Sequence, residues 1–316
     1  MDDVAERPLA KRPSRIGMAR LFDQALGAYL GLAVGDALGA TVEFMTSGEI
    51  AAQYGRHRDI VGGGWLRLKP GQVTDDTTMS LALGDALLDG RRTGRPFDTR
   101  LMAEAFVQWW QGKPVDCGNT CRRGIMRYIS DGSLAGPFNE GDAGNGALMR
   151  NLPVVLATLG QPQRLQEVSL AQARITHHHP LSDAATLAFG EMLHALLSEG
   201  EPALVMPACR QIADKWVARH GVFRFEPYPG RASAYVVDTV QTVWHDFFVS
   251  HDFESAVVGA VNRGGDADTN GALVGMLAGA RFGAHAIPRR WLGKLDRAIC
   301  LQITEQTSAL LAATDW

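Results

Sequence analysis

Residues 21–39 read LFDQALGAYLGLAVGDALG, and this stretch decides the fold class. Its apolar residues recur at intervals of three and four, the spacing that places side chains on one face of an α-helix. One side of that helix also carries glycines four residues apart, at Gly27, Gly31, Gly35 and Gly39. Because a glycine costs up to about 1 kcal/mol inside a helix, four on one side indicate that another backbone or a ligand comes very close.

Helical periodicity continues along the rest of the chain. We expect further helices at 77–88, 99–110, 145–159, 164–175, 181–197, 207–218, 232–248, 253–261, 269–282 and 288–311. Strand-like alternation is scarce, and residues 65–68 are the best short candidate for a strand. The economical interpretation is an all-α domain of ten or more helices.

The composition of the 316 residues is ordinary for a soluble globular protein, with 46% hydrophobic and 21% charged residues. With a formal net charge of -3, the chain lacks the overall positive charge that would attract nucleic acid. No stretch approaches the roughly 18 uninterrupted apolar residues of a membrane span. Four cysteines do not make a disulfide framework. We therefore expect a cytoplasmic protein with reduced thiols.

No linker, low-complexity run or clear internal repeat divides the chain. We expect residues 1–19 to form a polar, flexible leader, and residues 20–316 to form a single domain. The leader contains basic residues but no apolar segment of the kind found in secretory signals.

Two acidic clusters stand at the starts of predicted helices, TDDT at 74–77 and GGDADTN at 264–270. A lone Asp-Thr pair is more simply explained as a helix N-cap. Capping needs one acceptor, however, and each cluster supplies two carboxylates and a hydroxyl. If the two helix starts face each other, four carboxylates converge and require neutralising cations. Two divalent ions balance four aspartates, and oxygen ligands alone suit Mg²⁺ or Mn²⁺ better than zinc.

Several motifs together carry a family resemblance. The stretch GLAVGDALG at 31–39 is followed by Glu43 and Phe44, and GDAGNGALMR occupies 141–150 between the two acidic clusters. With those clusters, they resemble the opening helix, the glycine-rich substrate loop and the two metal-binding motifs of the ADP-ribosylglycohydrolase family. The motifs span residues 27 to about 283, nearly the whole chain. Each motif alone would be weak evidence for the family, but together they are highly specific for it.

Three more segments resemble one branch of that family, which acts on the nitrogenase iron protein of nitrogen-fixing bacteria. They are GGWLRLKPGQ at 63–72, PVDCGNTCRRG at 114–124 and AQARITH at 171–177. The resemblance implies a compact, orthogonal multi-helix bundle and a binuclear centre of two Mn²⁺ or Mg²⁺ ions. It implies removal of ADP-ribose from an arginine of the iron protein, which restores nitrogenase activity.

The same resemblance implies regulatory partners. They are a trimeric PII-type signalling protein and, through it, the ammonium channel, which would recruit the protein to the inner membrane. The sequence shows no amphipathic anchor or lipidation motif, so we expect no direct membrane insertion. We expect a monomer.

Carried over position by position, the resemblance implies a role for each matching residue. The implied metal ligands are Thr74, Asp75, Asp76, Asp266, Asp268 and Thr269. The candidate acid–base residues are Asp116 and Glu43, which the sequence does not rank. The implied substrate-binding residues are Asn119, Glu140, Gly144, Asn145, Gly146, His177 and Tyr235. We expect the loop at 141–146 to offer N–H groups to the pyrophosphate at the start of the helix from Asn145, and Tyr235 to stack on adenine.

Simpler interpretations of single residues stay open. Asp116 could cap a helix that starts near Thr120, and residues 177–179 could be an ordinary polar loop. At helical spacing, Tyr235 and Trp244 are more often core residues than ligand platforms. Tyr228 is close to Tyr235 in the sequence and could be the true substrate partner instead.

Three other functions also stay open. The first is a hydrolase of another linkage, such as serine-linked ADP-ribose or small ADP-ribose derivatives, which a panel of substrates would distinguish. The second is a non-catalytic ADP-ribose-binding regulator, against which the intact set of four aspartates and two threonines argues. The third is a two-metal phosphohydrolase, which would release phosphate rather than arginine.

Overall fold

The computed structural model describes residues 15–312, and helices make up its architecture. The α-helices are α1 (Arg15–Gly39), α2 (Ser47–Tyr54), α3 (Asp75–Arg92), α4 (Thr99–Gln111), α5 (Asn119–Asp131), α6 (Leu152–Ala157), α7 (Pro162–Arg174), α8 (Pro180–Ser198), α9 (Pro202–Arg219), α10 (Val236–Val249), α11 (Phe253–Val261), α12 (Ala267–Phe282), α13 (Arg289–Leu292) and α14 (Arg297–Ala312). Three 3₁₀ helices accompany them, η1 (Glu140–Asp142), η2 (Gly221–Phe223) and η3 (Ala284–Ala286). Within 15–312 there is no strand, only isolated β-bridges. The prediction of an all-α fold is confirmed.

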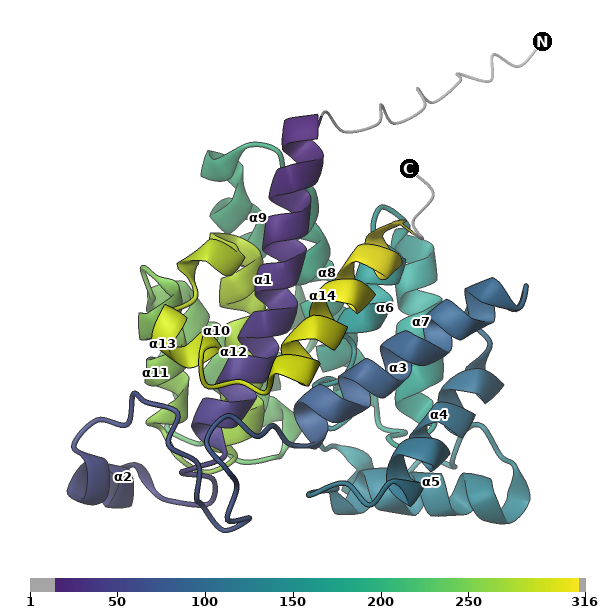
Figure 1. The fold of residues 1–316 in the computed structure, drawn as a ribbon, viewed down its shortest axis with the longest axis horizontal. Helices are drawn as coiled ribbons and strands as arrows, with labels where there is room; N and C mark the ends of the chain where they lie inside the picture. Colours follow the sequence, from purple (N-terminus) through teal and green to yellow (C-terminus); the bar gives the residue numbers. More distant parts are fainter. Residues whose placement is uncertain (1–14, 313–316) are drawn as a thin grey trace.

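Helix α1 runs through the middle of the molecule (Figure 1). Helices α10, α11 and α13 lie on one side of it in this view, and α3 to α7 lie on the other. The buried apolar residues form one cluster that extends from Leu21 to Leu311. From this continuous core we infer that the two sides belong to one domain. Of the helices in the described range, none combines the length and apolar character needed to cross a membrane.

The glycine side of α1 meets the backbone of α12. A Cβ atom added at Gly35 would lie 1.9 Å from the carbonyl oxygen of Gly271, and one added at Gly279 would lie 1.9 Å from that of Gly27. Such distances leave no room for any side chain, so only glycine permits this approach. Because the earlier glycine of α1 pairs with the later glycine of α12, the two helices are antiparallel. The sequence left open whether a backbone or a ligand approaches the glycines of α1, and the structure shows that it is the backbone of α12.

This packing brings three helix ends together. At the C-terminal end of α1, a Cβ added at Gly39 would lie 2.1 Å from the carbonyl oxygen of Ala267, the first residue of α12. One turn earlier, the carboxylate of Asp36 accepts hydrogen bonds from the backbone N–H groups of Thr74 and Thr77, where α3 begins. Helix α1 therefore holds the N-terminal ends of α3 and α12 at one place, in the lower centre of Figure 1.

Two predicted helices differ from the structure. No α-helix begins at Asn145: residues 146–150 form turns, and α6 starts only at Leu152. Pro153 occupies an early position of α6, where proline is tolerated because its missing N–H would have no partner. The helix expected at 288–311 is divided into α13 and α14, with Gly293 at the end of α13.

Other boundaries also differ. Residues 65–68 are not a strand but part of a turn, closed by a bridge between Gly63 and Leu68. Residues 15–19, expected in the leader, belong to α1, and residues 1–14 lie outside the described range. Helix α2 was not predicted. The other expected helices are present with shifted ends, and 253–261 is α11 with unchanged bounds.

Candidate active site

A cleft with a volume of about 460 Å³ opens where α3, α5 and α12 begin. Its walls contain most of the site residues expected from the sequence: Glu43, Asp75, Asp76, Asp116, Asn119, Gly144, Asn145, Gly146, His177, Asp266, Asp268 and Thr269. Asp76 and Thr269 are 193 positions apart in the chain, yet the Thr269 hydroxyl lies 3.3 Å from a carboxylate oxygen of Asp76. The two acidic clusters therefore meet in one cleft.

The carboxylates of the cleft are crowded. Thr269 Oγ1 lies 3.3 Å from Asp266 Oδ1 as well as from Asp76 Oδ2. One carboxylate oxygen from each of Glu43, Asp116 and Asp268 lies within 4.8 Å of the others. Acidic groups from the α1–α2 loop, α3, the loop before α5 and the start of α12 thus share one small space.

Burial and mutual repulsion strongly disfavour the charged forms of these acids. Burial, with the neighbouring carboxylates, raises the pKa of Asp76 and that of Asp268 well above the ordinary range. Burial, followed by the charge of Asp116, raises the pKa of Asp75 to about 7. Burial also raises the pKa of Glu43 to about 8, against the opposing hydrogen bond from Trp65. The cluster therefore lacks compensating positive charge.

A divalent cation fits this donor set. Asp76 Oδ1 is buried and has no hydrogen-bond partner, and a buried polar atom of this kind calls for an explanation such as an ion. The surrounding donors are carboxylate and hydroxyl oxygens, which suit Mg²⁺ and Mn²⁺. The residues present therefore form a buried acidic cluster compatible with metal binding.

Asp36 holds the start of α3, which carries Asp75 and Asp76, although its position in the sequence predicts no role in the site. Its side chain is fully buried, and its carboxylate accepts the Thr77 hydroxyl at 2.6 Å and the Thr74 N–H at 3.0 Å. Burial raises the pKa of Asp36 to about 6, while these hydrogen bonds act in the opposite direction. The available signal was that Asp36 is the one charged residue of the stretch 28–39 of this helix.

The loop at 143–146 forms another wall. The Asn145 amide donates hydrogen bonds to Asp266 Oδ2 at 2.5 Å and to Thr239 Oγ1 at 3.0 Å. Because the Asn145 N–H is bonded to the carbonyl of Ala234 and no helix begins there, the expected helix N-terminus for the pyrophosphate is wrong. A Cβ added at Gly146 would lie 2.9 Å from the His177 ring, so the loop packs directly on that histidine.

His177 is buried against this loop. Burial, followed by the charge of Arg150, lowers the pKa of His177 well below its usual range, so its ring is neutral near pH 7. Its Nδ1 atom lies 2.8 Å from the hydroxyl of Thr176. Residues 177–179 do form the loop between α7 and α8, but His177 is buried in that loop rather than exposed to solvent.

Comparison with known proteins agrees with this geometry. Residues 18–315 match the sequence model of the ADP-ribosylglycohydrolase family. The chain belongs to the ADP-ribosylglycohydrolase family. The ADP-ribosyl-[dinitrogen reductase] glycohydrolase of Rhodospirillum rubrum is 58% identical over 292 residues, which cover 92% of this chain and 97% of that protein. The resemblance expected from the sequence is confirmed.

More distant relatives of this ADP-ribosylglycohydrolase agree. The ADP-ribosylarginine hydrolase Tri1 of Serratia proteamaculans (strain 568) is 33% identical over 297 residues, covering 90% of this chain and 78% of that protein. A solved structure described as an ADP-ribosylglycohydrolase-related protein complex superimposes with a TM-score of 0.79 at 33% identity. The match covers 94% of this chain and all of the other, so it extends over nearly the whole fold.

Two aromatic residues that were not expected at the site complete the cleft of this ADP-ribosylglycohydrolase. Phe44 and Trp65 both line it. Trp65 Nε1 donates a 2.6 Å hydrogen bond to Glu43 Oε2. The indole thereby fixes the carboxylate of Glu43 at the edge of the cleft.

Three expected site residues are not among the residues that line the cleft: Thr74, Glu140 and Tyr235. Thr74 is fully buried, and its hydroxyl lies 3.4 Å from Asp76 Oδ2. The Glu140 side chain is 86% exposed and lies 3.5 Å from His179. Tyr235 is 43% exposed and pairs through its backbone with Gly144.

The simpler interpretations can also be compared with the structure. Gly118, not Asp116, is the N-cap residue of α5. Trp244 is a fully buried core residue, whereas the exposed Tyr235 is not. Tyr228 does not line the cleft; its ring stacks on His245 and lies under the guanidinium of Arg263.

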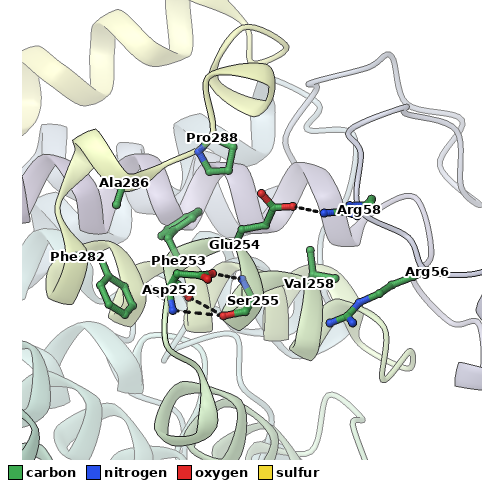
Figure 2. Close-up of a pocket in the computed structure, with 10 residues that line it drawn as sticks. All are labelled: Arg56, Arg58, Asp252, Phe253, Glu254, Ser255, Val258, Phe282, Ala286 and Pro288. Carbon is green, nitrogen blue, oxygen red and sulfur yellow. Dashed lines mark hydrogen bonds and ion pairs between the residues drawn. The ribbon is translucent and has the colours of Figure 1, made fainter.

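A separate hollow of about 580 Å³ lies beside α11 (Figure 2). Its acidic groups already have partners. Glu254 pairs with Arg58 and Arg290, and Asp252 accepts the N–H of Ser255 at the start of α11. Since neither acid is left without a partner there, we assign the chemistry of this ADP-ribosylglycohydrolase to the cleft of aspartates.

Proposed function

We propose that this chain is a metal-dependent hydrolase that removes ADP-ribose from a modified arginine of dinitrogenase reductase, the nitrogenase iron protein, and so restores nitrogenase activity. The observation that carries the proposal is the cleft in which both acidic clusters meet Glu43 and Asp116. The choice of target is supported by the Rhodospirillum rubrum relative, whose name specifies dinitrogen reductase. The choice of an arginine linkage is supported by the Serratia relative, named for ADP-ribosylarginine.

Two divalent cations, Mn²⁺ or Mg²⁺, would be held by Thr74, Asp75, Asp76, Asp266, Asp268 and Thr269. When bound, such ions orient ribose hydroxyls and act as Lewis acids toward water. Two observations support this assignment: the contacts of the Thr74 and Thr269 hydroxyls with the carboxylates of this set, and the unpartnered oxygen of Asp76.

The reaction breaks the bond between C1 of ribose and a guanidinium nitrogen. The oxygen of water goes to C1, and the proton released from water replaces the lost bond on the arginine nitrogen. Asp116 and Glu43 are the groups that move this proton, because both reach the same small space as Asp268. Each is held in place, Asp116 by the N–H of Cys117 at 2.7 Å and Glu43 by Trp65.

The other walls of the cleft hold ADP-ribose. Asn119, the loop Gly144–Gly146 and His177 face the same space as the acids, and they are assigned to the ribose and the pyrophosphate. Glu140 and Tyr235 are assigned to the outer rim. The exposed ring of Tyr235 suits stacking against adenine.

Regulation through partners belongs to the same proposal. A trimeric PII-type signalling protein binds the enzyme and recruits it to the inner membrane through the ammonium channel. The support for this is the resemblance to the branch that acts on the iron protein. Co-purification of the chain with a PII-type protein, with and without the channel, tests it; the absence of any complex would remove this part of the proposal.

The function is tested with two substrates, the same protein or peptide carrying ADP-ribose on arginine or on serine. With Mn²⁺, the arginine linkage should be cleaved faster, and chelator should abolish the reaction. Asp116→Asn and Glu43→Gln should each lower turnover more than affinity for ADP-ribose, whereas the exposed Asp89→Asn should change neither. Faster cleavage of the serine linkage would contradict the assigned substrate. Binding of ADP-ribose without any cleavage would instead indicate a regulator.

A further inference from the structure

Two large aromatic side chains stand exposed at the edge of the cleft. Phe44 is 65% exposed and Trp65 is 52% exposed, and their ring centroids are 5.4 Å apart. Neither ring is needed to fill the core. Exposed aromatic pairs beside a cleft are typical of surfaces that contact a ligand or a partner.

Both rings are attached to the acidic site. The Phe44 N–H donates a 2.7 Å hydrogen bond to the carbonyl of Gly265, next to Asp266, and Gly265 donates to Met45 in return. Phe44 adopts a φ of +64°, in the left-handed region that bulky residues rarely occupy. Such backbone strain persists where the surroundings impose it, often at ligand sites. Trp65 is anchored through its hydrogen bond to Glu43.

A second hollow continues from the cleft toward α2. It has a volume of about 720 Å³ and shares Glu43, Phe44 and Trp65 with the cleft, but not the loop Gly144–Gly146 or His177. Its lining includes the carboxylates of Glu43 and Glu49 and, among the described residues that form it, no lysine or arginine. The carboxylate of Glu49 accepts hydrogen bonds from the N–H and the hydroxyl of Thr46, which favour its charged form. This charge and the two aromatic rings make the groove suitable for a cationic occupant.

We propose that Phe44 and Trp65 form the binding site for the arginine side of the substrate, with the guanidinium stacked on the aromatic pair next to Glu43 and the flanking peptide in the groove toward α2. This inference rests on the proposed function, because only a hydrolase of arginine-linked ADP-ribose needs such a site. A guanidinium is planar and cationic, so it stacks on aromatic faces and pairs with carboxylates. A serine leaving group has neither property, so this site would select the linkage.

Two substitutions of Phe44 separate the aromatic contribution from simple bulk. Phe44→Leu keeps an apolar side chain but removes the ring, whereas Phe44→Tyr keeps the ring. Phe44→Leu should lower kcat/KM for an ADP-ribosyl-arginine peptide by about three- to thirtyfold, the range of a single cation–π contact. Phe44→Tyr should lower it much less than Phe44→Leu does, and Leu204→Ala, an exposed apolar control on α9, should leave it unchanged. Binding of free ADP-ribose, measured by calorimetry, should be the same in all of these proteins.

Binding of the modified peptide to the Asp116→Asn protein provides a readout that does not depend on turnover. In the Asp116→Asn protein, Phe44→Leu should weaken binding of the modified peptide but not binding of free ADP-ribose. If Phe44→Leu weakens the binding of both ligands equally, or changes the binding of neither, the inference is wrong. If the wild-type protein fails to cleave the arginine linkage, the proposed function is wrong; the difference between Phe44→Leu and Phe44→Tyr in peptide binding still decides whether the aromatic pair recognises arginine.

Discussion

The carboxylate of Asp36, on α1, accepts a 2.6 Å hydrogen bond from the hydroxyl of Thr77, on α3. It also accepts the backbone N–H groups of Thr74 and Thr77. The first N–H groups of a helix have no partner within the helix, and the Thr74 side chain makes no capping bond to them. A residue from a distant helix therefore caps α3 and orients its two aspartates.

Replacing Asp36 by Asn should damage both the fold and the metal site. An amide offers one oxygen where the carboxylate offers two, so in either orientation its NH₂ group faces at least one buried N–H donor that a carboxylate oxygen now accepts. We expect a loss of about 2–3 kcal/mol in the free energy of unfolding and a loss of at least about tenfold in Mn²⁺ affinity. Denaturant melts and metal titration measure these changes. The control Asp85→Asn, which removes a carboxylate bonded to Gln306 further along α3, should change stability without changing Mn²⁺ affinity.

The backbone contact between α1 and α12 gives a second prediction. Gly35→Ala would place a methyl group 1.9 Å from the carbonyl oxygen of Gly271, so the two helices must separate. We expect destabilisation of about 3 kcal/mol or more, at the upper end for overpacked cores, together with weaker Mn²⁺ binding. Gly48→Ala on α2 is the matched control, since its nearest atom is 4.0 Å away. An unchanged melting temperature for Gly35→Ala would disprove this packing.

Much of this arrangement could be predicted from sequence, because its signals are local. Glycines four residues apart on one helix required a very close neighbour, and the two Asp-Thr clusters supplied more carboxylates than caps need. Their meeting depends on the antiparallel pairing of α1 and α12, which no local pattern specifies. Asp36 was missed for the same reason, since its partners Thr74 and Thr77 lie on another helix.

The errors have identifiable physical causes. Residues 147–149 are all buried although they form turns, so the apolar pattern there does not distinguish a helix from a buried loop. Helix α2 buries only Ile50 and so shows no apolar stripe. Its capping box, formed by Thr46 and Glu49, was the available signal. The alternation at 65–68 favours a strand, whereas the glycines before Trp65 favour the turn that the structure contains.

Removing metal should lower stability, because ions that bind only the folded protein stabilise it. At a free Mn²⁺ concentration of 100 times Kd, the expected gain in the free energy of unfolding is about 2.7 kcal/mol. Asp268→Asn should abolish this gain and should also make the metal-free protein more stable, since it removes one of the repelling carboxylates. Calorimetric melts with chelator and with Mn²⁺ measure both effects. Asp89→Asn, an exposed change on α3, should behave as wild type, and identical melts of the two wild-type forms would rule out a buried cation.

A further prediction concerns acid, through His57. Its side chain is buried, and Nε2 lies 2.9 Å from the carbonyl oxygen of Leu38 at the end of α1. Burial lowers the pKa of His57 below its ordinary value, although the hydrogen bond to Leu38 acts in the opposite direction. In the unfolded chain, the same ring titrates with an ordinary pKa of about 6.5. Below that pH, the unfolded state therefore binds a proton that the folded state does not.

The contribution of His57 to stability should be fully present above about pH 6.5 and should decline as the pH falls below it, by at most about 1.4 kcal/mol per pH unit. His57→Gln keeps a donor for the Leu38 carbonyl but cannot take up a proton, so its free energy of unfolding should fall less steeply between pH 6.5 and 5 than that of the wild type. Denaturant melts across this range measure the difference between the two slopes. Ile60→Val, a neutral truncation of a buried residue three positions further along the chain, should lower stability equally at every pH and so leave the wild-type slope intact. Parallel curves for wild type and His57→Gln would show that the buried imidazole takes up its proton in the folded protein as readily as in the unfolded chain.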